Sequence, residues 1–321
     1  MTFNTIKTSS KKLYLRLLLS LGLVFILLIA GCSSFSKIKE KTLDITSGIK
    51  ISKNSDFTKK MGVAVFENKT NFSDGDFQDR FQIHLLETLR KECPEILLLA
   101  PGDAEYPEDL IELPRRISGQ VDNLALAKAG RQSGLNAVVT GVIIDIRGKE
   151  EERGFWWFKE PERFTRVQIV AEVYDAETGS KIIDESFIHE IEMDGLEGES
   201  TASAKEIDVA AVNDAIMHIG TEMGESICKT VGDQPWRGFI VSVAENKIIL
   251  SQGEKAGLKL GDILDVHENE DIIDGVNGQQ FLVPGLKIGE IEIIAVYPER
   301  AEAIAVSGDG IDAGCSVRPK D

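Results

Sequence analysis

Histidine, carboxylate and hydroxyl side chains build most catalytic and metal sites, so their spacing is the first indication of chemistry in a sequence. None of the four histidines stands in a metal-ligand spacing such as H-E-x-x-H; they are His84, His189, His218 and His267. His84 and His218 fall in segments with helical periodicity, where a surface histidine or a hydrogen-bonded core histidine is the ordinary case. We therefore expect no metal ion and no cofactor.

Two short motifs approach known sites but lack essential parts. Gly198-Glu-Ser-Thr-Ala202 resembles a nucleophile elbow, yet it lacks the second glycine and the preceding strand. Asp74-Gly-Asp76 lacks the glycine and the glutamate that complete a calcium loop, and helix capping explains it better. No glycine pattern for phosphate or dinucleotide binding is present. The sequence therefore predicts a protein that is not an enzyme.

The beginning of the chain has the layout of a secretory leader. Basic residues at positions 7–16 precede an apolar run, Leu17 to Ala30, and small residues then precede Cys32. A plain transmembrane anchor is the alternative, but the run is shorter than the ~20 residues that a spanning helix needs. Leu28-Ile-Ala-Gly-Cys32 resembles the bacterial lipobox, which implies cleavage after residue 31 and acylation of Cys32. The resemblance also implies outer-membrane sorting, on the periplasmic face, because Ser33 replaces the aspartate that commonly retains lipoproteins in the inner membrane.

The segment 32–60, rich in Ser, Lys and Thr, is expected to be a tether that could reach about 90 Å if fully extended. Without the four basic residues of the leader, 32 basic side chains face 53 acidic ones, a formal charge of −21. This charge argues against nucleic-acid binding and against non-specific attraction to anionic lipid heads. Membrane attachment should therefore come from the acyl chains on Cys32, since two or more give stable anchoring.

Three cysteines remain in what would be an oxidising compartment: Cys93, Cys228 and Cys315. An odd number allows at most one bridge within the chain. Cys93 and Cys228 each lie near the end of a predicted helix, so they are the pair we consider for a disulfide. The alternative is that all three are small buried hydrophobic residues.

The segment 61–231 alternates strand and helix patterns. Strands are expected at 61–66, 96–99, 137–146, 165–174 and 181–193, with helices at 77–93, 121–133 and 204–231. The last three strands should form an antiparallel meander, with a turn at Asp175–Gly179. Gly220 and Gly224 lie four residues apart inside the last helix, each costing ~1 kcal/mol relative to Ala, which predicts that another element packs closely there.

Four aromatic residues in a row, Phe155, Trp156, Trp157 and Phe158, stand between two strongly charged stretches. One interpretation is a hairpin tip that binds a partner or touches a membrane. The other is that the aromatic side chains fold back onto the sheet. We take the four residues as a candidate partner-binding site.

The segment 232–321 reads as short strands separated by frequent turns, at 239–243, 248–250, 263–267, 290–296 and 301–306. Strands this short and turns this frequent predict a small all-β barrel. The whole chain is therefore expected to be α+β: an antiparallel or mixed sheet with packed helices, followed by the barrel.

Family resemblances support this division. Leu250-Ser-Gln-Gly253, Gly257-Leu-Lys-Leu-Gly-Asp262 and Leu286-Lys-Ile-Gly289 resemble the C-terminal SH3-like domain of FlgT, although Ala256–Ile263 also resembles the core motif of a PDZ domain. Val63-Ala-Val-Phe-Glu-Asn68, Val138-Val-Thr-Gly141 and Val173-Tyr-Asp-Ala-Glu-Thr-Gly179 resemble the α/β domain of CsgG and the TolB amino-terminal domain. The pore hairpins that a CsgG likeness implies are not evident, because Asp145 to Phe164 is short and heavily charged.

The combined expectation is a non-enzymatic outer-membrane lipoprotein that acts as a periplasmic scaffold of an envelope or secretion apparatus, curli-like or flagellar-like. Its partners would be envelope proteins, with self-association into a homo-oligomer as a further option. A CsgG-type channel subunit and a PDZ-containing periplasmic adaptor are the alternatives.

Overall fold

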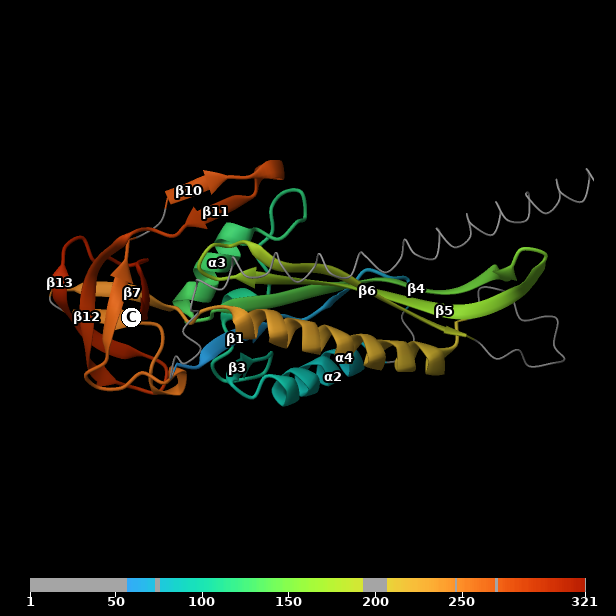
Figure 1. Ribbon diagram of the computed structural model, residues 1–321, viewed down its shortest axis with the longest axis horizontal. Helices are drawn as coiled ribbons and strands as arrows, with labels where there is room; N and C mark the ends of the chain where they lie inside the picture. The colour runs from blue at the N-terminus through green and yellow to red at the C-terminus, as the bar shows by residue number, and fades with distance from the viewer. Residues whose placement is uncertain (1–56, 73–75, 193–206, 246, 269–270, 321) are drawn as a thin grey trace, which may run out of the picture. The chain divides into compact units, whose positions relative to one another are not determined.

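The fold is α+β, as expected, with a mixed sheet and its helices preceding a closed barrel in the chain (Figure 1). The computed structural model describes residues 57–72, 76–192, 207–245, 247–268 and 271–320. The start of the predicted helix at 204 and the Gly198–Ala202 motif lie outside these ranges.

The first part is built on a six-stranded sheet. Its strands are β1 (Lys59–Val63), β2 (Glu67–Asn68), β3 (Ile96–Leu99), β4 (Ala137–Phe155), β5 (Phe158–Asp175) and β6 (Lys181–Glu192). The order is β3-β1-β4-β5-β6, with β2 also paired to β4. β1 runs parallel to β3 and β4, whereas β4, β5 and β6 form the predicted antiparallel meander. β1 begins two residues before the expected strand 61–66 and ends at Val63, and Lys60 to Val63 are all buried, as is typical of a parallel strand that is covered on both faces.

Helices cover both faces of this sheet. The main core lies on the face covered by α2 (Phe77–Glu92) and α4 (Val209–Asp233), and a smaller core on the face covered by α3 (Asn123–Gln132). Val139 belongs to the first core and its neighbour Val138 to the second. This division follows from the strand geometry, because successive side chains point to opposite faces.

The two glycines of α4 mark where α2 packs against it. A Cβ atom added at Gly220 would lie 2.8 Å from His84 Cδ2, and one added at Gly224 would lie 2.5 Å from Thr88 Cγ2. Both distances are shorter than ordinary van der Waals contact. The prediction of a close helix contact at these positions is confirmed.

The β4–β5 hairpin is longer than the sequence predicted. We expected the first strand to end at Ile146 and the second to begin at Thr165, but pairing continues to Phe155 and Phe158. Charged side chains hold this extension together by pairing across strands, as in the 2.9 Å contact between Arg163 Nε and Glu150 Oε2. Hydrophobic alternation, the usual indication of a strand, is therefore absent from it.

The second part is a closed barrel with the strand order β12-β13-β8-β7-β14-β9. These strands are β7 (Gly238–Ala244), β8 (Lys247–Leu250), β9 (Ile263–His267), β12 (Lys287–Val296), β13 (Ala301–Gly308) and β14 (Ser316–Pro319). Within the described residues its only helices are the single turns η2 (Glu254–Ala256) and η3 (Val276–Gly278), whereas a PDZ groove needs a longer helix. Closure supports the barrel interpretation of this segment over the PDZ one.

Three four-residue strands of this part were not predicted, although β8, of the same length, was expected at 248–250. They are β14 and the hairpin strands β10 (Asp271–Asp274) and β11 (Gln280–Val283). β11 packs on α3, where Leu282 is buried against Leu124 and Ala127. Such short segments carry too little periodicity to be recognised without their pairing partners.

Candidate functional site

The candidate partner-binding residues form the tip of the long hairpin, which we call the hairpin apex (Phe155–Phe158). Phe155 pairs with Phe158, so Trp156 and Trp157 are the two residues of the turn. Two-residue hairpin turns favour Asn-Gly or similar pairs, because at least one residue needs a positive φ. Trp156 takes that conformation, with φ 56°. A bulky residue there is a strained choice for local stability.

The side chains of Phe155, Trp156 and Trp157 are exposed to water rather than folded onto the sheet. Phe155 is 81% exposed, Trp156 72% and Trp157 69%. The rings contact one another, with centroids 4.4 Å apart for Trp156 and Trp157. For these three residues the structure corresponds to the hairpin-tip interpretation, and the partner they would bind stays a proposal.

The charged residues below the apex neutralise one another. Arg153 Nη2 lies 2.6 Å from Glu190 Oε2 of β6, and its guanidinium stacks over the Phe164 ring at 4.1 Å. Lys149 Nζ lies 2.8 Å from Glu151 Oε1, and this hydrogen bond lowers the pKa of Glu151. The hairpin stem is therefore held by paired charges, and the apex carries its exposed apolar surface.

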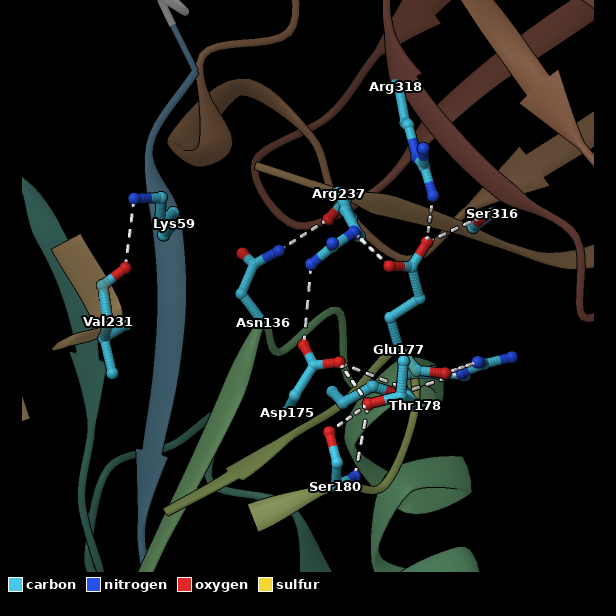
Figure 2. A network of polar contacts seen from close by, with 12 residues as sticks. Lys59, Asn136, Asp175, Glu177, Thr178, Ser180, Val231, Arg237, Ser316 and Arg318 are labelled. Atoms are coloured by element: carbon cyan, nitrogen blue, oxygen red, sulfur yellow. Dashed lines mark hydrogen bonds and ion pairs between the residues drawn. The ribbon is translucent and has the colours of Figure 1, made fainter. Parts of the chain in front are cut away.

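A buried carboxylate at the opposite end of β5 joins the sheet to the barrel (Figure 2). Glu177 has no solvent-exposed side-chain surface, and Arg318 Nη2 of β14 donates to its Oε1 at 2.9 Å. Ser316 Oγ approaches the same oxygen at 3.3 Å, while Arg237 forms an ion pair with Oε2. Two guanidinium groups thus compensate one buried carboxylate, which is the arrangement of a structural ion pair.

The turn that carries Glu177 is fixed by its neighbours. Asp175 Oδ2 accepts hydrogen bonds from the Thr178 backbone N–H at 3.0 Å and from Thr178 Oγ1 at 2.6 Å. Gly179 has a φ of 73°, which glycine tolerates, and Asn136 Nδ2 donates to the Arg237 carbonyl at 2.8 Å. The predicted turn at Asp175–Gly179 is therefore present, and it also forms part of the junction between the two parts.

A second group of charges ties β1 to the barrel. Glu299 Oε2 lies 2.7 Å from Lys60 Nζ, and Glu299 Oε1 lies 2.6 Å from Lys255 Nζ. Lys255 also reaches Glu105 Oε1 at 2.6 Å. Burial opposes ionisation of Glu299, but the hydrogen bonds from Lys255 and Lys60 outweigh it and lower its pKa to about 2.

Cys93 and Cys228 are disulfide-bonded in the structure, with Cα atoms 5.4 Å apart. The bond joins the end of α2 to α4 across 135 residues. Cys315 is buried in the barrel core. Cys32, the proposed lipidation site, lies outside the described residues.

Two of the four histidines meet in space although they are far apart in the sequence. The rings of His189 on β6 and His218 on α4 stack with centroids 4.0 Å apart. Burial, and then the neighbouring His218, lower the pKa of His189. His84 Nε2 lies 3.0 Å from Thr221 Oγ1. No group of three or more metal-ligating side chains is found within the described ranges.

The clefts of this fold are lined by side chains that already have partners. One, of about 660 Å³, lies between β2 and the segment 110–115. The adjoining one, of about 350 Å³, includes Glu172 and Tyr174, whose hydroxyl donates to Glu172 Oε2 at 2.7 Å. Arg115 at their shared edge is ion-paired with Glu67.

The residues of the junction were not identified from the sequence. Glu177 pairs with residues 60 and 141 positions further along the chain, and no local pattern relates them. Two acidic residues in a predicted turn, Asp175 and Glu177, were the one available indication. A turn normally presents such residues to solvent, so their burial is visible only in the structure.

The fold and the junction together define a class of protein: a mixed α+β sheet joined by buried ion pairs to a closed barrel. No protein-family model matches the chain, and no curated protein sequence matches it. Within the described residues, no helix has both the length and the apolar character needed to cross a membrane.

Several solved structures resemble about half of the chain. The hypothetical protein CT253 from Chlamydia trachomatis is 10% identical, with a TM-score of 0.32, over 54% of this chain and 98% of its own. The PelC dodecamer from Paraburkholderia phytofirmans is 12% identical, with a TM-score of 0.28, over 56% and 91%. Lipoprotein GNA1162 from Neisseria meningitidis is 12% identical, with a TM-score of 0.28, over 51% and 97%. Likenesses at this level carry no argument about function.

Proposed function

We propose that the protein is a non-enzymatic, lipid-anchored protein of the bacterial outer membrane that faces the periplasm and acts as an assembly module. Acyl chains on Cys32 would hold the body to the membrane through a tether that ends before Phe57, since β1 already begins at Lys59. The α/β part (61–231) and the barrel (232–321) would serve as two interaction modules that the junction holds together.

The hairpin apex is the observation that carries this proposal. The turn of Trp156 and Trp157 is unfavourable for local stability, because Trp156 has a positive φ, and it exposes large apolar rings. Exposed aromatic clusters of this kind mark sites of interaction with a protein or with a membrane, because aromatic side chains supply large contact areas. The stem below them is braced by ion pairs, so the apex is presented as a defined shape.

Two measurements test the proposal. Cells that produce the wild-type chain or Cys32→Ala are labelled with a clickable palmitate analogue and fractionated; only the wild type should carry label and sediment with outer membrane. Photocrosslinking groups are then placed at exposed positions on separate elements, Ile117, Ile188 and Ile272. Discrete crosslinks to an envelope protein or to a second copy support an assembly role. A body that stays monomeric and uncrosslinked in whole cells contradicts it.

A CsgG-type channel subunit is the second candidate, and the length of the hairpin favours it. β4 and β5 have 19 and 18 residues, whereas a strand that crosses a membrane needs about 9–11. The charge pattern opposes this candidate, because spanning strands place an apolar residue at every second position and Lys149–Arg153 has none. Single-channel conductance of the lipidated protein in planar bilayers decides between the two; its absence rules out the channel. The choice between a curli-like and a flagellar-like apparatus rests on the domain resemblances alone.

A further inference from the structure

We infer that the hairpin apex inserts into the interfacial region of a lipid bilayer, as a second membrane contact beside the acyl chains. The inference rests on the proposed function and names the partner of its contact surface. The apex would dip into the headgroup and upper acyl region without crossing the membrane.

The size and shape of the apex favour a deformable partner. Each aromatic side chain can bury about 150–250 Å², so the three exposed rings, Phe155, Trp156 and Trp157, offer at most about 450–750 Å². A stable protein interface buries about 800 Å² on each partner, in a patch of 20–30 residues. A convex tip of three rings does not provide that patch. A bilayer surface closes around a convex tip, so it needs no matching pocket.

The chemistry of the apex fits the membrane interface. Tryptophan is enriched at both surfaces of membranes, where its ring lies among the acyl chains and its indole N–H remains hydrated. On each side of the hairpin the apolar apex comprises one strand residue and one turn residue, a depth of about 7 Å at the usual rise per residue. Interfacial segments bury their apolar face by about 5–10 Å, which agrees with this depth.

Charges limit how deep the apex can go. Lys149–Arg153 and Lys159–Arg163 follow the apex directly on the two strands, with four basic and five acidic side chains between them. Charged groups are costly in hydrocarbon, so insertion would stop where these residues reach the headgroups. These charged residues therefore oppose a hairpin that spans the membrane and limit the hairpin to interfacial insertion.

The two membrane contacts can be made together. The chain joins the body at Phe57, whose ring stacks on Trp236 at 4.7 Å, and Met61 pairs with Ala137 at the first residue of β4. The 19 residues of β4 then extend about 60 Å to the apex. The 24 residues from Ser33 to Asp56 have a contour length of about 80 Å, so the anchor can share a bilayer with the apex. Anchoring raises the effective concentration of the apex at the membrane, which compensates for a weak individual contact.

Tryptophan fluorescence tests this inference directly, because the chain has only three tryptophans. Trp156 and Trp157 are exposed at the apex, whereas Trp236 is 2% exposed in the barrel. The lipidated protein, purified from cells, is reconstituted into phosphatidylcholine vesicles with plain or chain-brominated lipid. We expect bromine to reduce the wild-type emission, and the emission to shift to shorter wavelength relative to detergent-free protein without vesicles. Trp156→Ala/Trp157→Ala, which retains Trp236, should lose both effects.

A matched control separates insertion from mere proximity to the vesicle. Ile117→Trp in the Trp156→Ala/Trp157→Ala background places a fully exposed indole in a turn remote in sequence from the apex. Its emission should be insensitive to brominated lipid. Equal quenching at position 117 would mean that the body lies on the membrane without using the apex, and would overturn the inference.

The outcome also distinguishes this inference from the proposed function. Suppose that Cys32 is acylated, that brominated lipid does not quench the wild-type emission, and that acrylamide does. The apex is then in water, and only the inference fails. If protection from acrylamide requires added envelope protein, the partner is a protein pocket and the inference again fails. If Cys32 is not acylated, the proposed function fails whatever the apex does.

Discussion

Replacing Gly224 by alanine should destabilise the protein, although alanine is the better helix former. Gly224 lies inside α4 where α2 crosses it. The new Cβ would lie 2.5 Å from Thr88 Cγ2 and 3.1 Å from Thr88 Cβ. Rotating the Thr88 side chain can move Cγ2 but not Cβ, so relief requires the helices to separate. The Cys93–Cys228 disulfide, one turn further along α4, restrains that movement.

The expected magnitude follows from two opposing effects. Alanine gains about 1 kcal/mol over glycine in a helix interior. Inserting a methyl group into a closely packed contact costs about 1–3 kcal/mol, and the upper part of this range applies because the neighbour is a buried backbone-proximal atom. The net change should be a loss of about 1–2 kcal/mol of unfolding free energy, measured by urea denaturation followed by circular dichroism.

The same substitution elsewhere in α4 is the matched control. A Cβ at Gly232 meets nothing closer than Glu95 Oε1 at 4.0 Å, so Gly232→Ala should keep part of the propensity gain and leave stability equal or slightly higher. Thr88→Ser removes the clashing methyl group, and Gly224→Ala should cost less in that background. If Gly224→Ala proves as stable as Gly232→Ala, the close packing of α2 and α4 is not what selects glycine, and the reasoning is refuted.

Three further predictions concern the charges and the disulfide. Glu177→Gln should cost about 3–5 kcal/mol in a urea titration, because it removes the charge that compensates Arg237 and Arg318 in a buried site; an unchanged midpoint would show that the junction is not stabilising. Glu299 has a pKa of about 2 in the folded protein against 4.5 unfolded, so its contribution is present above pH 4.5 and is lost as the pH falls toward 2. Because Glu299 is partly exposed, that contribution should be about 1 kcal/mol, and Glu299→Gln should flatten the acid limb of the stability profile by this amount. Reducing the Cys93–Cys228 bond, which closes 135 residues, should lower the unfolding free energy by about 2–5 kcal/mol, whereas the Cys93→Ser/Cys228→Ser variant should not respond to reductant.

Periodicity was sufficient to predict the elements that bury an apolar face. In α4, which was expected at 204–231, Val212, Ile216 and Met223 follow one another at helical spacing and lie in the core. The paired glycines in the same helix indicated a close contact, because each is unfavourable in a helix unless a neighbour needs the space. These inferences succeed because one local pattern determines both the element and the face that it buries.

The length of the β4–β5 hairpin depends on pairing between residues far apart in the sequence, so it could not be predicted from local patterns. The outer half of the β4–β5 hairpin has charges where strand patterns expect apolar residues, and its partners lie on the opposite strand. Pro161 is compatible with this strand because β5 pairs with β6 only as far as Phe164, so the proline lies on an edge. The cross-strand charge pairing and the edge position of Pro161 can be identified only once the strand register is known.

The residues of the candidate site could be predicted from the sequence, but their position in the turn could not. Composition alone identified the four aromatics, because such a run is unusual between charged stretches. Their position in a two-residue turn was not predictable, since Trp-Trp is not a turn dipeptide and no glycine or asparagine follows. The stacking of His189 on His218 likewise depends on the packing of α4 against β6.

The charged stem and the aromatic apex together explain how a long hairpin can be both stable and soluble. A hairpin that extends beyond the core has two strands only, and an isolated two-stranded ribbon is marginally stable in water. An apolar face would stabilise it but would also expose a long hydrophobic surface. Cross-strand ion pairs and the Arg153–Phe164 contact supply support while keeping the stem soluble. The exposed aromatic side chains of the hairpin, Phe155, Trp156 and Trp157, thereby lie at the apex, where the inferred shallow membrane contact requires them.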